Sequence, residues 1–177
     1  MASELQRRKV TGVFVAMDVD GDGFLEEADF RALARRWTVQ RGSALGSPAA
    51  DRLNTIMMGW WTTLLAASDL DRDNRVSLDE VLGVVDRLGE MLDAVTGTAE
   101  AMFEAVDENG DGEISAAEYR GLIEAWSGRA TDTDAVFARL DGNGDGRLSK
   151  PEFVELWTEF WAGDDPDAPG TVTFGEL

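Results

Sequence analysis

The sequence predicts an all-α protein, a compact helical fold in which four acidic loops pair two by two through short strands. Twelve-residue segments with acidic or amide side chains at alternating positions occur at residues 18–29, 69–80, 107–118 and 141–152. Apolar residues flank each segment at the spacing of a helix face. Each segment therefore predicts one helix that enters the loop and one that leaves it.

The flanking residues define the helices in order along the chain. The entering helices carry an apolar residue four positions before each loop, which places that side chain toward the core: Phe14, Leu65, Phe103 and Phe137. The leaving helices begin with an apolar residue just after the loop: Phe30, Val81, Tyr119 and Phe153. We expect helices at 3–17, 27–40, 50–68, 78–95, 98–106, 116–126, 132–140 and 150–162.

Two domains are predicted, each holding one pair of loops. Residues 1–95 hold the first pair, with a linker at about 41–49 that is rich in Gly, Ser and Pro. Residues 96–177 hold the second pair and a tail, 163–177. We expect Thr96-Gly97-Thr98 to interrupt the helix between the pairs, so that the pairs fold against each other and form no dumbbell.

Each loop matches the EF-hand pattern, in which oxygens at positions 1, 3, 5, 7, 9 and 12 surround a calcium ion. Position 6 requires a sharp turn, which glycine tolerates and asparagine tolerates next best. Gly23, Gly112 and Gly146 stand there in three loops and Asn74 in the second. Position 8 is aliphatic in every loop, as expected for strands that pair the loops. Solvated acidic turns and helix-capping boxes of the Ser-x-x-Glu type explain only part of this pattern.

The candidate metal ligands follow from these positions. In loop one they are Asp18, Asp20, Asp22, Phe24, Glu26 and Asp29. In loop two they are Asp69, Asp71, Asp73, Arg75, Ser77 and Glu80. In loop three they are Asp107, Asn109, Asp111, Glu113, Ser115 and Glu118. In loop four they are Asp141, Asn143, Asp145, Arg147, Ser149 and Glu152.

Loops three and four are closest to the full pattern. Loop one ends on Asp29, whose shorter arm favours Mg²⁺ over Ca²⁺ unless Glu26 reaches the ion directly. Loop two keeps its ligands, but Arg72 and Arg75 reduce its attraction for a cation. We therefore expect three or four Ca²⁺ ions, with Mg²⁺ as an alternative in loop one and loop two as the weakest site.

Composition narrows the function further. The formal net charge is −19, and the chain contains no Cys and no His. This charge disfavours nucleic acid and anionic membranes, and the missing residues remove the usual zinc ligands and the commonest general base. We expect no catalytic residue, no enzyme activity and no membrane span. Residue 2 is Ala, whereas N-myristoylation needs Gly at this position. We therefore expect a cytoplasmic protein, and we also expect a monomer.

The chain resembles calerythrin and the sarcoplasmic calcium-binding proteins. The resemblance covers nearly the whole chain and is most specific at 18–30 and in the ending 173–177. It implies a compact, buffer-type calcium protein of bacterial origin. One departure stands out, because calerythrin-like proteins have a degenerate second loop and this chain keeps the ligands there.

The first functional hypothesis is a Ca²⁺ buffer or Ca²⁺-modulated signalling protein. The alternative is a calmodulin-type sensor that opens on Ca²⁺ to bind an unidentified protein target. A third reading, less favoured because His is absent, is a luciferin-binding or photoprotein-like protein. We expect the six Trp residues to lie in the core, with Trp157, Phe160 and Trp161 closing the halves together. Val172 and Phe174 are expected to anchor the tail.

Overall fold

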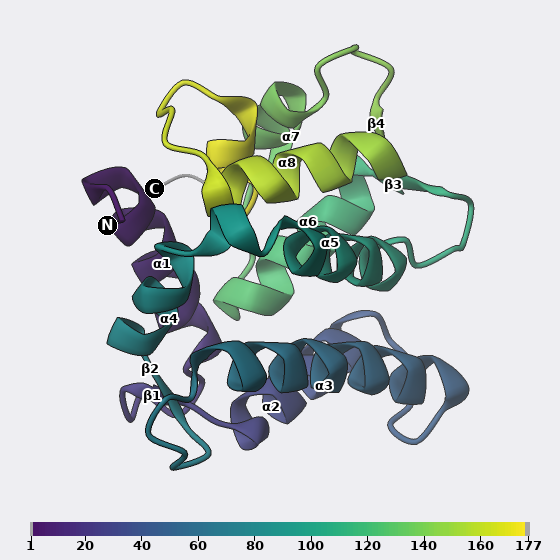
Figure 1. The fold of residues 1–177 in the computed structure, drawn as a ribbon. Helices are drawn as coiled ribbons and strands as arrows, with labels where there is room; N and C mark the ends of the chain where they lie inside the picture. The colour runs from purple at the N-terminus through teal and green to yellow at the C-terminus, as the bar shows by residue number, and fades with distance from the viewer. Residues whose placement is uncertain (1, 176–177) are drawn as a thin grey trace.

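The computed structural model describes residues 2–175, and within that range the chain forms eight α-helices and two short sheets (Figure 1). Met1, Glu176 and Leu177, which belong to the predicted domains and tail, lie outside the described residues. The N-terminal elements are α1 Glu4–Met17, β1 Phe24–Leu25, α2 Glu27–Gln40, α3 Pro48–Ser68, β2 Val76–Ser77, α4 Leu78–Val85 and the 3₁₀ helix η1 Leu88–Glu90. The C-terminal elements are α5 Leu92–Val106, β3 Glu113–Ser115, α6 Ala116–Ser127, α7 Asp134–Leu140, β4 Arg147–Ser149, α8 Lys150–Ala162 and the 3₁₀ helix η2 Pro169–Val172.

The structure differs from two details of the expected helices: the start of α3, which lies two residues earlier, and the position of the break between the loop pairs. Helix α3 begins at Pro48, because the Ser47 side chain caps it by accepting a hydrogen bond from the Ala50 N–H at 3.2 Å. The connection between α2 and α3 is therefore shorter than the predicted linker. Residues 96–98 do not interrupt a helix either, since α5 runs through them and the break lies at residues 86–91.

The continuity of α5 has a simple cause. One glycine inside a helix costs only about 1 kcal/mol, and the face formed by Val95, Ala99 and Met102 is buried. The Thr98 hydroxyl donates to the Val95 carbonyl oxygen at 2.7 Å, which keeps it bonded within the helix. Burial of that face therefore outweighs the local preference of Thr-Gly-Thr. The two-domain division itself stays a prediction.

The four loops pair as the aliphatic residues at position 8 predict. Strands β1 and β2 are antiparallel with Leu25 opposite Val76, and β3 and β4 are antiparallel with Ile114 opposite Leu148. All four of these side chains are buried, with at most 1% exposed. Each pair of loops is thus held together by a short ladder whose central side chains are part of the core.

The two loop pairs fold against each other, as expected. In Figure 1, α2 and α3 lie side by side below α5, α6 and α8, while α1 and α4 run along one side. The ring of Trp60 in α3 stacks on Trp126 of α6, with centroids 5.6 Å apart and planes at 26°. Trp60 also meets Trp157 of α8 at 5.5 Å. These contacts join the N-terminal and C-terminal helices in a single aromatic core.

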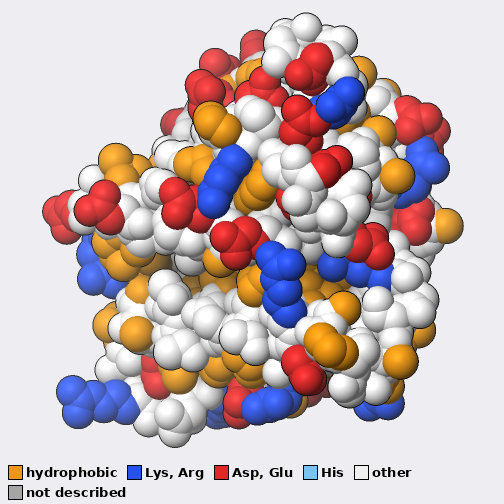
Figure 2. Space-filling view, turned by 90° about the vertical axis from the view of Figure 1, so that its right-hand side faces the viewer, with side chains coloured by type: hydrophobic (Ala, Val, Ile, Leu, Met, Phe, Trp, Pro, Cys, Tyr) orange, Lys and Arg blue, Asp and Glu red, His pale blue; other side chains and the backbone are white. Residues whose placement is uncertain are grey.

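The tryptophans are core residues, as predicted. Five of them are at most 8% exposed and Trp161 is half-buried: Trp37, Trp60, Trp61, Trp126 and Trp157 form the buried set. Figure 2 shows one face of the molecule, with acidic side chains spread over its surface and hydrophobic side chains visible in a hollow across its middle. Over residues 2–175, no helix is both long enough and apolar enough to span a bilayer.

The tail packs on the aromatic core through the two residues expected to anchor it. Val172 is 5% exposed, and the Phe174 ring lies 4.8 Å from Phe160 and 5.3 Å from Trp157. The hydroxyl of Tyr119 in α6 donates to the Thr173 carbonyl oxygen at 2.9 Å. The tail therefore closes over α6 and α8 with both apolar and polar contacts.

Candidate metal centres

Each entering helix ends on the acid at position 1 of its loop. The N–H groups of Asp18, Asp69, Asp107 and Asp141 donate to the carbonyl oxygens of the apolar residues four positions earlier, at 2.9 to 3.0 Å. Those apolar residues are the ones that the sequence places toward the core. The packing of one apolar side chain per helix against the core therefore positions the first acid of each loop.

The same network of side chains and backbone shapes all four loops. The N–H at position 6 donates to the carboxylate at position 1, at 2.9, 3.0, 2.9 and 2.7 Å in loops one to four. The N–H at position 5 donates to the side chain at position 3, at 3.0 to 3.2 Å. The N–H at position 7 donates to the carboxylate at position 5, at 2.9 Å in every loop. Each carboxylate is thereby turned into its loop.

Carboxylate oxygens converge in three of the loops. Groups of three acids whose oxygens lie within 4.8 Å of one another occur in loops one, two and three: Asp18, Asp20 and Asp22; Asp69, Asp71 and Asp73; and Asp107, Asp111 and Glu118. Like charges at this separation repel one another without a cation. Such a set of oxygen donors fits a hard divalent cation such as Ca²⁺ or Mg²⁺.

Loop four differs in its side-chain arrangement. Within residues 2–175 it does not form such a group, and the Asn143 amide donates to Glu152 at 2.7 Å. Like loop three, it carries carboxylates at only two of the positions 1, 3 and 5, Asp141 and Asp145. In loop four the amide at position 3 thus pairs with the acid at position 12, and the ranking of the loops stays a prediction.

The acid at position 12 closes each loop by bonding to backbone. It accepts from the N–H at position 9 at 2.9 Å in all four loops. In loop one, Asp29 also accepts from the Val19 N–H at 3.0 Å, and its side chain is only 3% exposed. Burial raises the pKa of the Asp29 carboxyl group. Glu26 forms an ion pair with Arg75, with 4.0 Å between Oε1 and Nε.

Side chains at position 7 lie outside the loops, so these residues offer only their carbonyl oxygens. Arg147 and Glu113 form an ion pair of 2.6 Å between loops four and three. Arg75 pairs with Asp73 at 3.3 Å and lies over the Phe24 ring at 4.1 Å. Each pair of loops is thus joined by an arginine at position 7 as well as by the strands.

Two residues of loop two have a left-handed backbone, and only one of them was expected from the sequence. Asn74 has φ of 64°, the left-handed conformation predicted for position 6. Arg72 at position 4 also has a positive φ, 61°, where the other loops have glycine. A non-glycine residue in this conformation costs about 1–2 kcal/mol. Loop two therefore has a strained left-handed arginine at position 4 in addition to the asparagine expected at position 6.

Arg41 is a second residue whose role near the loops could not be predicted from the sequence. It follows α2, yet its guanidinium donates to the Ala105 carbonyl oxygen at the end of α5 and lies 3.7 Å from Glu108 in loop three. It also stacks over the Trp37 ring at 4.6 Å. Arg41 therefore ties the connection after loop one to loop three, a link that only tertiary contact creates.

In a comparison with models of known protein families, the EF-hand family matches residues 10–34, 99–123 and 133–157. These segments contain loops one, three and four. The match agrees with the loop network described above. The chain therefore contains three segments that match the EF-hand family, and its fold is that of an EF-hand protein.

Within this class the chain is similar to the sarcoplasmic calcium-binding proteins. It is 35% identical over 111 residues to the alpha-B and -A chains of the Penaeus protein, an alignment that spans 58% of this chain and 57% of that one. It is 29% identical over 180 residues to sarcoplasmic calcium-binding protein 1 of Astacus leptodactylus, with 90% of each chain covered. The chain thus spans little more than half of the first relative and nearly all of the second.

Solved structures share the fold. The coelenterazine-binding protein of Renilla muelleri, in a calcium-loaded apo form, has a TM-score of 0.78 at 23% identity, covering 99% of this chain and 100% of that one. A calcium-binding protein of Streptomyces coelicolor has a TM-score of 0.74 at 24% identity, covering 90% and 99%. The sarcoplasmic calcium-binding protein of amphioxus has a TM-score of 0.73 at 19% identity, covering 100% of both chains.

Proposed function

We propose that the protein is a compact Ca²⁺ buffer or Ca²⁺-modulated signalling protein. The observation that carries this proposal is the stacking of Trp60 on Trp126 at 5.6 Å, which joins helices of the two loop pairs. A sensor of the calmodulin type needs a hydrophobic groove that it can open to a target. Here the apolar helix faces of both pairs are packed against each other, which supports binding of Ca²⁺ without large opening.

The proposed ligands are the oxygens at positions 1, 3, 5, 7, 9 and 12 of the four loops. Three or four Ca²⁺ ions would bind, and the short side chain of Asp29 at position 12 favours Mg²⁺ as an alternative in loop one. Ca²⁺ would neutralise the repulsion within each acidic loop and so stabilise the folded chain. Binding to the folded state alone raises its stability by mass action.

Calorimetric titration of the full chain with Ca²⁺ tests the ligand assignment. Glu118→Gln and Glu152→Gln each keep the size of the side chain and remove one charge. We expect each variant to lose about tenfold or more in affinity at its own loop, equivalent to about 1.4 kcal/mol or more. Asp79→Asn, which neutralises an exposed acid at position 11 of loop two, is the control. Variants that titrate like the wild type would contradict the assignment.

Small-angle X-ray scattering tests the functional class. We expect nearly the same radius of gyration in saturating Ca²⁺ and in saturating Mg²⁺, and no capture of a basic amphipathic helical peptide. Expansion in Ca²⁺ together with tight, Ca²⁺-dependent capture of that peptide would instead establish the sensor.

A further inference from the structure

The C-terminal end of α2 contacts both helices of loop three. Arg36 donates from Nη1 to the carbonyl oxygens of Ala125 and Trp126, at 3.1 and 3.4 Å, near the end of α6. Arg41, the residue that follows α2, donates to the Ala105 carbonyl oxygen near the end of α5. Helix α5 enters loop three and α6 leaves it. An N-terminal helix therefore holds the two helices of a C-terminal loop, each at one point.

Both arginine side chains are well placed for these bonds. A cation near the C-terminus of a helix is favoured by the helix dipole and can bond the last carbonyl groups. The Arg41 side chain is only 15% exposed, and its guanidinium lies over the Trp37 ring at 4.6 Å. Gly128, which caps α6, leaves room for the other arginine, since a Cβ there would lie 3.1 Å from Nη1 of Arg36. The surroundings of each side chain thus favour its bonded position.

The two points of contact lie at opposite ends of the helix pair. Ala105 lies beside loop three, because α5 ends at Val106 and the loop begins at Asp107. Ala125 lies near the far end of α6, which ends at Ser127. A change in the angle between α5 and α6 therefore alters the separation of these points, and such a change accompanies Ca²⁺ binding in EF-hands that open. As one continuous helix of 14 residues, α2 resists that change.

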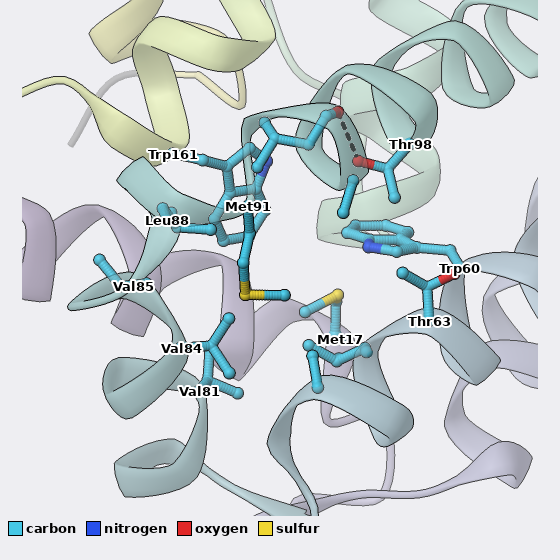
Figure 3. Close-up of a pocket in the computed structure, with 14 residues that line it drawn as sticks. Met17, Trp60, Thr63, Val81, Val84, Val85, Leu88, Met91, Thr98 and Trp161 are labelled. Carbon is cyan, nitrogen blue, oxygen red and sulfur yellow. Dashed lines mark hydrogen bonds between the residues drawn. The ribbon is translucent and has the colours of Figure 1, made fainter.

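Toward its start, α5 meets the N-terminal half through apolar groups instead. Figure 3 shows this part of the junction, where Thr98 of α5 borders a small cavity together with Trp60 of α3 and Met17 of α1. Among residues 2–175, no charged side chain lines that cavity. Apolar contacts are non-directional, whereas hydrogen bonds weaken steeply as their angles depart from linearity. The bonds from the two arginines therefore restrain the orientation of α5 and α6 more than these apolar contacts do.

Helix α2 also begins at loop one. Asp29, the proposed ligand at position 12 of that loop, lies in the first turn of α2. Its carboxylate accepts from the Val19 N–H at 3.0 Å and from the Glu26 N–H at 2.9 Å, so it already joins both ends of the loop to the helix. A cation that engages Asp29 would restrain the start of α2. The same helix therefore connects loop one with the helices of loop three.

We propose that Arg36 and Arg41 are positioning residues that couple the two loops, so that Ca²⁺ in loop one raises the affinity of loop three. The sign follows because an ion in loop one orders α2, and loop three then closes between helices that are already held in place. By linkage, Ca²⁺ in loop three raises the affinity of loop one by the same factor. This inference rests on the proposed binding of Ca²⁺ by both loops.

Amide groups at position 6 report each loop separately. The N–H groups of Gly23 and Gly112 donate to the carboxylates of Asp18 and Asp107, each at 2.9 Å. Their NMR resonances therefore follow loops one and three in the full chain labelled with ¹⁵N-glycine. Asp18→Asn keeps the size of the side chain and weakens loop one. We expect it also to lower the Ca²⁺ affinity of loop three, measured at Gly112, by at least about fivefold.

The same Asp18→Asn change is then made in Arg36→Met and in Arg41→Met. We expect it to alter the affinity of loop three by less than about twofold in either background. Arg35→Met, at the neighbouring exposed arginine of α2, is the matched control and should keep the fivefold effect. A merely structural role of the arginines would weaken loop three without removing its dependence on loop one. The two variants are independent tests if one of them does not fold.

Two outcomes would overturn the coupling alone. One is a wild-type chain in which Asp18→Asn changes loop three by less than about twofold, a result that needs no arginine variant. The other is an effect of Asp18→Asn that is as large in the folded Arg36→Met and Arg41→Met chains as in the wild type. If the Gly112 resonance of the wild type does not respond to Ca²⁺ at all, the proposed function fails together with the coupling.

Discussion

Lys9 in α1 donates a hydrogen bond from Nζ to the carbonyl oxygen of Gly163, 2.8 Å away at the end of α8. The lysine is only 1% exposed, and its ammonium group lies 5.4 Å from the centroid of the Phe160 ring. Burial lowers the pKa of Lys9. A cation at a helix C-terminus is favourable to the helix dipole, so Lys9 joins the first helix to the last.

Replacement of this lysine tests the junction. Lys9→Met keeps an apolar side chain of similar length but leaves the Gly163 carbonyl oxygen without this donor, which costs about 1–3 kcal/mol. The matched control is Lys150→Met, because Lys150 is the other lysine of the chain. It forms an exposed ion pair with Glu104 at 3.9 Å, and its loss costs less than about 1 kcal/mol. Urea unfolding in saturating Ca²⁺ measures both, and equal effects would contradict the role of Lys9.

Tyr119 predicts a loss of stability at alkaline pH. The side chain is 1% exposed and burial raises its pKa. In the unfolded chain the phenol loses its proton near pH 10, whereas in the folded chain it stays protonated. The unfolded state therefore binds fewer protons above about pH 10, and the free energy of unfolding falls as the pH rises.

Tyr119→Phe separates this effect from other titrations. At neutral pH the variant lacks the hydrogen bond to Thr173 and is less stable by about 1 kcal/mol. It has no phenol to ionise, so its stability falls less than that of the wild type above about pH 10. Urea unfolding across this pH range should show the two stability curves converging. Parallel curves would show that Tyr119 does not cause the alkaline loss.

The left-handed Arg72 predicts that loop two can be improved. Arg72→Gly relieves strain of about 1 kcal/mol, less the extra freedom of glycine in the unfolded chain. It also removes a positive charge from the loop, so we expect tighter Ca²⁺ binding there. Gly21→Arg makes the reverse change at position 4 of loop one, where φ is 70° and no atom would lie within 4 Å of a Cβ. We expect it to lower the melting temperature of the metal-free chain and to weaken Ca²⁺ binding.

Calorimetry and thermal unfolding of both variants measure these opposite shifts. If Arg72→Gly weakens Ca²⁺ binding in loop two, then neither strain nor charge limits that loop.

Phe174 predicts how strongly the tail holds the halves together. Its ring lies 5.7 Å from Trp126 and 5.3 Å from Trp157, and the residue is half-buried. Phe174→Ala should cost about 2–3 kcal/mol, less than a fully buried Phe→Ala change because part of the ring is exposed. Val39→Ala, at a side chain that is 59% exposed, should change stability by less than about 0.5 kcal/mol. Urea unfolding followed by Trp fluorescence checks both, and a small effect of Phe174→Ala would show that the tail is dispensable.

Local patterns predicted most of the helices and the loop pairing. Six of the predicted helices agree with the structure to within two residues at both ends. Their ends are predictable because they depend on local features, namely the spacing of the apolar residues and the acids at the ends of each loop. The region around Thr96-Gly97-Thr98 was predicted wrongly, since its composition favours a break and only the burial of Val95 and Met102 keeps α5 continuous. The strain at Arg72 was not predicted, because the pattern of ligands places no requirement on position 4 and only the backbone φ of 61° reveals it.

The sequence by itself determined the four loops and the oxygen ligands that they offer, because each loop lies within about twelve residues. It also predicted the strands, because the aliphatic residue at position 8 recurs in every loop, although the paired strands lie far apart in the chain. Only the tertiary structure decided the contact of Arg41 with loop three, the hydrogen bond from Lys9 to Gly163 and the stacking of Trp60 on Trp126. These features join segments far apart in the chain. Their geometry depends on how the two loop pairs pack together, which no local spacing of residues records.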